Sequence, residues 1–156
     1  MPPSARILPV SPLARVPRGF TLVEIMLALI VVGILAAVAL PAYQQMVQKS
    51  RRSDAIAMLT AVQQAQERWR ANRTSYTSRL SDLGFSSGSS PKGYYEIALS
   101  NVGTSTYTVT ATPVSTGAQS SDSQCASLGI AVSGGQVSYT SADSARQPTS
   151  SKCWAQ

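Results

Sequence analysis

A glycine, an aromatic residue and a single carboxylate lie where this chain turns apolar, and their spacing is the strongest indication of chemistry in the sequence. Gly19 ends a basic leader, Phe20 begins an apolar run that lasts to Leu40, and Glu24 is the only ionisable side chain in that run. A carboxylate inside such a segment costs about 2.5–3.5 kcal/mol to insert into a bilayer, so it needs a partner. Cleavage between Gly19 and Phe20 would leave a cationic amine on Phe20, and Glu24 would be its candidate counter-charge.

The composition excludes several classes of active site. The chain has no histidine, which rules out Ser-His-Asp catalysis and His-based zinc sites. Its seven acidic residues are scattered, and no pair of them is spaced like a catalytic acid and base. Asp122 and Asp143 are too few to predict a calcium loop. We therefore expect no catalytic residue, no metal site and no cofactor.

Cys125 and Cys153 are the two cysteines of the chain. If the C-terminal region is exported to an oxidising compartment, they would most simply pair. A disulfide closing a loop of this size stabilises a small domain by about 3–4 kcal/mol in the chain-entropy model. The alternative is two buried free thiols.

A resemblance gives these residues specific roles. Gly19-Phe20-Thr21-Leu22-Val23-Glu24, followed by an apolar helix with a proline, resembles the prepilin signal of type IV pilins and type II secretion pseudopilins. In that family a membrane peptidase cleaves after the glycine and methylates the new N-terminus. The resemblance implies cleavage between Gly19 and Phe20, N-methylation of Phe20, a role for Glu24 in subunit assembly, and a disulfide closing the C-terminal region. Two further segments resemble minor pilins of the PilE type: Pro41-Ala42-Tyr43-Gln44-Gln45 and Ser50-Arg51-Arg52-Ser53-Asp54-Ala55.

Two other interpretations of the N-terminal segment remain open. An ordinary secretory signal would use Arg15 and Arg18 as its basic region and Ala37-Val38-Ala39 as its cleavage site. The apolar core of such a signal would be unusually long, and a charged residue such as Glu24 at its start would serve no purpose in a signal peptide. A plain transmembrane anchor would leave both Glu24 and the glycine-aromatic junction unexplained.

The elements that must position these residues follow from periodicity. We expect a leader at 1–19, an apolar transmembrane and assembly helix at 20–40, an amphipathic continuation at 41–72 and a pilin head at 73–156. Gly33 and Pro41 are predicted kink positions, and Asn72 a stop signal. Along the amphipathic part, a set of residues at helical spacing predicts the seam against the head, with Trp69 as its largest anchor: Ala55, Met58, Leu59, Val62, Ala65 and Trp69.

Strand signals occupy the second half of the chain. Four segments fit strands: 94–99, 106–112, 128–132 and 136–139, the last two joined by a hairpin turn at Gly134-Gly135. In 106–112 the residues alternate, which puts Tyr107, Val109 and Ala111 on one face. Hydrophobic residues of the connecting loop, Leu80 and Phe85 among them, are expected to pack on the helix or sheet. The predicted fold class is α+β, a long N-terminal helix on a four-stranded antiparallel sheet.

Two groups of basic residues remain. Lys49, Arg51 and Arg52 are predicted to be a solvated helix face or to touch lipid headgroups, with a filament contact as the functional alternative. A second group lies near the helix end, without aromatic residues interleaved in a way that would strengthen a DNA-binding interpretation: Arg68, Arg70, Arg73 and Arg79. The chain without its leader is only mildly basic, which is too little to predict DNA binding by itself.

Together these features predict a structural subunit of a type IV pilus, most simply a minor pilin acting in pilus assembly or initiation. A type II secretion pseudopilin and a DNA-binding minor pilin are the alternatives. The partners implied by the resemblance are the prepilin peptidase, the major pilin and other minor pilins, and the inner-membrane assembly platform. The subunit would sit in the inner membrane with a periplasmic head and then enter an extracellular pilus.

Overall fold

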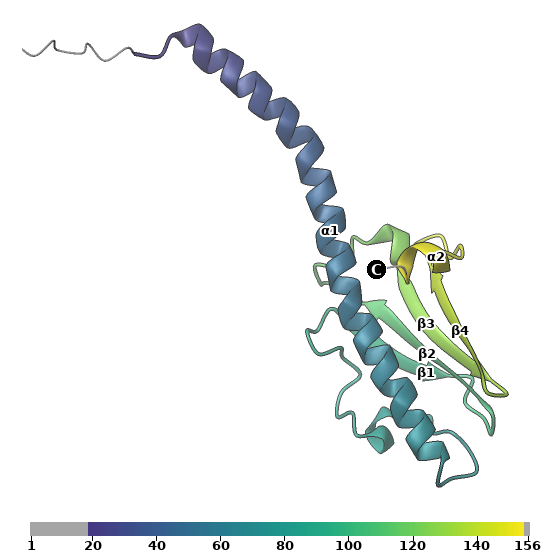
Figure 1. Cartoon of the computed structure of the whole chain (residues 1–156). Coiled ribbons are helices and arrows are strands. Elements are labelled where there is room, and N and C mark those ends of the chain that lie inside the picture. The colour runs from purple at the N-terminus through teal and green to yellow at the C-terminus, as the bar shows by residue number, and fades with distance from the viewer. Residues whose placement is uncertain (1–18, 155–156) are drawn as a thin grey trace, which may run out of the picture. The chain divides into compact units, whose positions relative to one another are not determined.

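The computed structural model describes residues 19–154, so the predicted leader lies outside the described residues apart from Gly19. The chain divides into two compact units, Met1–Leu40 and Pro41–Gln156. Its elements are, in order, α1 (Leu22–Arg70), η1 (Leu80–Leu83), β1 (Tyr95–Ser100), β2 (Thr106–Pro113), η2 (Ser123–Cys125), β3 (Ser127–Ser133), β4 (Gln136–Ala142) and α2 (Ser150–Cys153) (Figure 1). This is the predicted α+β class.

Helix α1 begins with a side-chain cap. The backbone N–H of Glu24 donates to Thr21 Oγ1 at 3.2 Å, which satisfies one of the free amide groups of the first turn. The helix is unbroken through Gly33 and Pro41 and ends at Arg70, two residues before the predicted stop at Asn72. The kinks proposed at Gly33 and Pro41 stay predictions.

The sheet is an antiparallel meander in the order β1-β2-β3-β4. All four strands were predicted, with bounds that differ by a few residues at most. Gly134 and Gly135 make the β3–β4 turn with φ of 57° and 82°. This left-handed conformation explains why the turn needs glycine at both positions.

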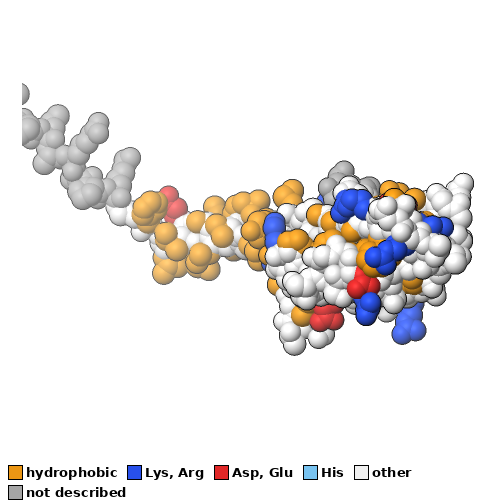
Figure 2. Space-filling view, turned by 90° about the horizontal axis from the view of Figure 1, so that it is seen from below, with side chains coloured by type: hydrophobic (Ala, Val, Ile, Leu, Met, Phe, Trp, Pro, Cys, Tyr) orange, Lys and Arg blue, Asp and Glu red, His pale blue; other side chains and the backbone are white. Residues whose placement is uncertain are grey.

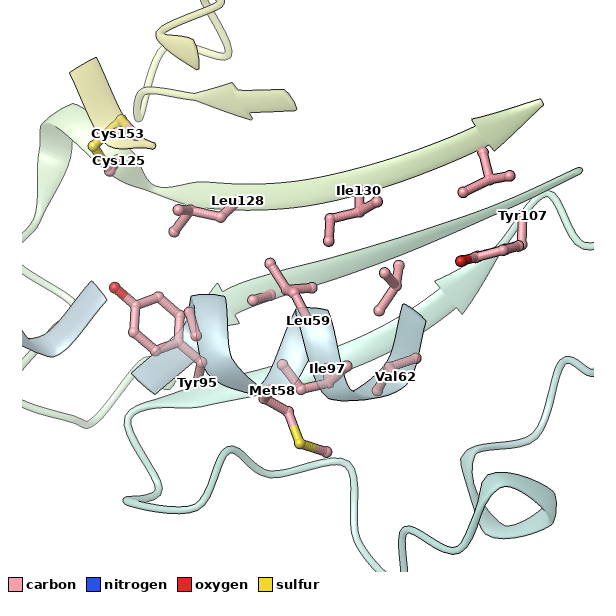
Figure 3. Packing of buried hydrophobic residues seen from close by; sticks show 14 residues of the cluster. Met58, Leu59, Val62, Tyr95, Ile97, Tyr107, Cys125, Leu128, Ile130 and Cys153 are labelled. Atoms are coloured by element: carbon pink, nitrogen blue, oxygen red, sulfur yellow. A yellow bond between two sulfur atoms is a disulfide. The ribbon is translucent and has the colours of Figure 1, made fainter. Parts of the chain in front are cut away.

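The core of the head lies between α1 and one face of the sheet. The predicted seam residues Ala55, Met58, Leu59 and Val62 are buried against side chains from β1, β2 and β3. Figure 3 shows Leu59 on the helix facing the strand residues Ile97 and Leu128. The facing strand residues are Tyr95, Ile97, Tyr107, Val109, Ala111, Leu128, Ile130 and Val132. The alternation predicted for 106–112 is therefore confirmed.

Trp69 is not the anchor that the sequence predicted. It is only half-buried, and it lies outside the core cluster. The fully buried residue near this end is Gln66, whose Nε2 donates to the Thr77 carbonyl at 2.7 Å and whose Oε1 accepts from the Thr77 N–H at 3.2 Å. The last turn of α1 is thus fastened to the following loop by a reciprocal pair of hydrogen bonds rather than by an indole.

The loop between α1 and β1 is packed, as expected. Tyr76, Leu80, Leu83 and Phe85 are partly buried against the core. The loop is also fixed to α1 by Asp54, a buried carboxylate that accepts from the Ser90 hydroxyl and from the Lys92 backbone N–H.

Candidate functional site

The proposed cleavage site lies just before α1 begins. Gly19 and Phe20 are exposed and have no regular secondary structure. A Cβ built on Gly19 would meet no atom within 4 Å among the described residues. Nothing in the described fold therefore requires glycine at this position, so a requirement for it would have to come from an enzyme that approaches the backbone.

The segment that follows presents apolar side chains on every side. Phe20, Leu22 and Val23 are 72–77% exposed, and this exposure continues through Leu40 at 60%. By length and composition this helix is long and apolar enough to cross a membrane, and its most apolar stretch is not buried. Figure 2 shows hydrophobic side chains covering the segment. Such a surface needs lipid or other helices around it.

Cys125 and Cys153 form the predicted disulfide, with their Cα atoms 5.8 Å apart. Both are buried: Cys125 ends η2, and Cys153 ends α2. Trp154 follows, packs on Tyr139 at 4.8 Å between ring centroids and donates its Nε1–H to the Thr140 carbonyl at 2.8 Å. The end of the described chain, at Trp154, is thereby held on β4 by contacts independent of the disulfide.

The basic group at Lys49, Arg51 and Arg52 is not one solvated face, and the prediction is wrong for Arg52. Its guanidinium is buried and donates from Nε and Nη2 to the two carboxylate oxygens of Asp122, at 2.7 and 2.8 Å. Arg51 donates to the Ala118 carbonyl at 2.9 Å and lies over the Tyr94 ring. Lys49 is exposed, as predicted.

The second basic group does combine with aromatic rings, contrary to the sequence interpretation. The chain reverses after α1, so that the Arg73 guanidinium stacks on Trp69 at 4.3 Å from the ring centroid. Arg70 lies over Tyr76 at 5.9 Å. The sequence missed this because the contacts require the turn that follows the helix.

An open hollow of about 480 Å³ lies here, and its lining includes Trp69, Arg73, Tyr76, Arg79 and Asp82. Asp82 accepts from the Thr77 hydroxyl and from Arg79, and these bonds lower the pKa of its carboxyl. Burial and the nearby Glu67 carboxylate raise the pKa of Tyr76. Asp82 already pairs with Arg79, so the Arg73 guanidinium, with hydroxyls of the 74–78 loop around it, is the group that gives this hollow the chemistry to bind an anion.

Acidic residues do not gather into a metal site in the part of the chain that is described, where no group of three His, Cys, Asp or Glu side chains could hold an ion. Asp122 is occupied by Arg52. Asp143 instead closes a turn by accepting from the backbone N–H groups of Ala145 and Gln147.

Comparison with known protein families shows to which family this chain belongs. Residues 15–40 match the model of the prokaryotic N-terminal methylation motif, a range that includes Gly19, Phe20 and Glu24. Residues 41–129 match the model described as "Type IV minor pilin ComP, DNA uptake sequence receptor". The chain belongs to the type IV pilin family.

Relatives of this pilin include the type IV major pilin protein PilE of Neisseria gonorrhoeae, 40% identical over 78 residues, which are 50% of this pilin and 47% of the relative. The fimbrial protein EcpC of Eikenella corrodens is 33% identical over 105 residues, 67% of this pilin and 68% of the relative. The fimbrial protein of Neisseria meningitidis Z2491 is 38% identical over 78 residues, 50% of this pilin and 46% of the relative. The pilin thus spans about half the length of the first relatives it matches.

Two roles in this pilin escaped the sequence interpretation although a signal existed. Thr21 caps α1, and the pattern Thr21-Leu22-Val23-Glu24 has the spacing of a capping box. Arg52 and Gln66 lie on the buried stripe, because positions 52, 55, 59, 62 and 66 share helical spacing. Because Arg52 and Gln66 are polar, the sequence pattern did not predict that they are buried.

Proposed function

We propose that this pilin is a minor subunit of a type IV pilus that acts in pilus assembly. The observation that carries the proposal is an exposed apolar helix whose methylation motif places one carboxylate, Glu24, five residues after the cleavage site. A prepilin peptidase would cut between Gly19 and Phe20 and methylate Phe20. The Glu24 carboxylate would then pair with the N-terminal amine of a neighbouring subunit, because neither charge is stable alone in lipid.

This pairing would also fix how far one subunit is displaced along its neighbour. In a single helix the amine and the Glu24 side chain meet only at a frayed end, so docking of a second pilin provides the better contact. The partners would be other pilins and the inner-membrane assembly platform. The disulfide supports a head outside the cytoplasm, where thiols are oxidised.

The experiment is to compare this pilin in sheared pili and in membranes of its host by quantitative immunoblotting. A few copies per filament and short or absent pili on deletion would support the minor role. An abundance equal to the bulk of the pilus protein would make it a major pilin, as several relatives are named. Loss of secretion with normal pili would favour the pseudopilin alternative.

DNA binding is a second candidate, favoured by one observation. The matched family is described as a DNA uptake sequence receptor, and the hollow at the end of α1 brings Arg73 and Arg79 beside Trp69. Guanidinium groups bind phosphate, and an aromatic ring beside them adds a stacking surface. The Arg73 contact with Trp69 holds the guanidinium in place.

The test is competition for duplex DNA by the full chain in detergent at two salt concentrations. Each lost phosphate contact should reduce the slope of log K against log salt by about 0.9. Arg73→Ala should weaken binding in this way, whereas Lys92→Ala, a change at another exposed cation of the head, should not. Equal effects of the two variants would place the DNA elsewhere on the head.

A further inference from the structure

The buried carboxylate of Asp122 is the centre of a hydrogen-bond cluster that the assembly function does not use. Oδ2 accepts from Arg52 Nε at 2.7 Å and from Gln119 Nε2 at 2.8 Å. Oδ1 accepts from Arg52 Nη2 at 2.8 Å and from the backbone N–H of Cys125 at 3.2 Å. The Asp122 side chain is completely buried and that of Arg52 is 10% exposed.

This cluster connects α1 directly to one cysteine of the disulfide. Gln119 Nε2 also donates to the Gln48 carbonyl at 3.2 Å, and Gln48 Nε2 donates to the Ser121 hydroxyl at 3.3 Å. Three residues of the 119–125 segment, Asp122 included, are therefore bonded to the helix. Through the Asp122 bond to its N–H, Cys125 is held in the short η2 turn just before β3. The helix position and the position of Cys125 are therefore coupled.

The other cysteine is held by different contacts. Cys153 ends α2. Just before this helix the Thr149 N–H donates to the Ser141 carbonyl at 2.9 Å, and just after it Trp154 donates to the Thr140 carbonyl. These contacts attach α2 to β4, on the far side of the sheet order from β1. Cys153 is thus attached to β4 without any contact to α1 among these bonds. Cys125 is attached on two sides, because the Ser123 carbonyl of η2 accepts from the Ser144 N–H at 2.9 Å and the Asp122 cluster adds a link to α1.

We propose that the Arg52–Asp122 ion pair positions Cys125 for oxidation, so that α1 docks on the sheet before the disulfide closes. The Asp122 bond to the Cys125 N–H is a local cap of η2, but the capping carboxylate is stable in its buried position only when its charge is paired, so the docking of Arg52 fixes the turn there. Without the docked helix, the segment before Cys125 lacks its bonds to Arg52 and Gln48. The disulfide then forms after the helix has packed on the sheet.

The oxidation itself is ordinary thiol–disulfide exchange with a disulfide-bearing oxidant. One cysteine thiolate attacks the oxidant's disulfide and forms a mixed disulfide, and the other cysteine displaces it. Net, the two electrons and the two thiol protons of Cys125 and Cys153 pass to the oxidant, by way of solvent for the protons, and the oxidant departs as two thiols. The ion pair takes no part in these steps, and Arg52 and Asp122 are positioning residues.

The test follows reoxidation of the reduced full chain in detergent by oxidised glutathione, with acid quenching and a maleimide gel shift. Rates are compared at urea concentrations that give each reduced chain the same folded fraction. Asp122→Ala removes the whole cluster. The double change Arg52→Met with Asp122→Leu fills the space with apolar side chains but leaves the Cys125 N–H without its acceptor. Asp54→Asn is the matched control. Like Asp122, Asp54 is a buried carboxylate, but it lies on α1 and contacts Ser90 and Lys92 instead of the Cys125 segment.

We expect both cluster variants to reoxidise about tenfold more slowly than the original chain, a factor equivalent to about 1.4 kcal/mol in activation free energy. Asp54→Asn should keep the original rate at equal folded fraction. If the double variant reoxidises at the original rate, or if Asp54→Asn is slowed as much as Asp122→Ala, the ion pair contributes stability alone and the proposal is wrong.

Discussion

Replacing Glu24 by glutamine separates two roles that its position allows. Glu24 is the third residue of α1, and its backbone N–H is bound to Thr21 Oγ1. A carboxylate there is favoured by the helix dipole and can cap the helix start. The proposed assembly role needs the negative charge itself. Glutamine can also occupy the capping position, but it carries no charge.

The magnitudes show that the local role is the smaller one. Losing the dipole interaction costs the helix about 0.3–1 kcal/mol. Removing the charge lowers the cost of insertion by about 2.5–3.5 kcal/mol. On balance, Glu24→Ala and Glu24→Gln should insert more readily than the original chain by about 2 kcal/mol. A defect in filament entry would then come from the lost contact with a neighbouring subunit.

The assay measures each variant in sheared pili relative to its amount in membranes. Both Glu24→Ala and Glu24→Gln should be processed and inserted yet enter pili poorly, and Glu24→Lys should be worse because it places two cations together. Thr21→Val is the matched control, since it removes the cap at about 1 kcal/mol without changing the charge. It should enter pili almost normally.

Two results would refute this reasoning. If Glu24→Gln enters pili normally while Glu24→Ala does not, the carboxylate acts as a helix cap. If Glu24→Ala also enters normally, the carboxylate is not an assembly contact at all.

Three further predictions concern processing and the head. Gly19→Phe should block cleavage and leave the head folded, because a Cβ at residue 19 would meet open space. Mass spectrometry of the original chain should find N-methylated Phe20 at its N-terminus. A mature N-terminus at Leu40 would instead establish a secretory signal. Cys153→Ser should lower the free energy of unfolding of the head by about 3–4 kcal/mol, measured by urea denaturation. An unchanged value would show that the unfolded chain without the disulfide is no less restricted in conformation than the unfolded chain with it. Burial, and then the Asp122 carboxylate, raise the pKa of Tyr95 to about 12. The stability that this tyrosine contributes is fully present below pH 10 and is lost as the pH rises toward 12, so Tyr95→Phe should show a shallower alkaline loss of stability, and an identical loss would contradict the assignment.

Local patterns were sufficient for most of the fold. Alternation over residues 106–112, the Gly134-Gly135 pair and the helical spacing of Ala55 to Val62 each reflect a constraint within a few neighbouring residues. The secondary structure and the buried faces could therefore be predicted. The family resemblance at Gly19 to Glu24 is local in the same sense, because a peptidase reads a short segment.

Contacts between distant residues were decided by the tertiary structure. The sequence predicted Trp69 as the largest residue of the seam and Arg52 as part of a solvated face, because helical spacing does not say where the sheet ends or what faces each position. Arg52 is buried because Asp122, seventy positions away, neutralises it, whereas Trp69 lies outside the core and takes Arg73 as its partner. Burial of a charge depends on a partner that periodicity does not contain, since the cost of removing the charge from water is offset only across the fold.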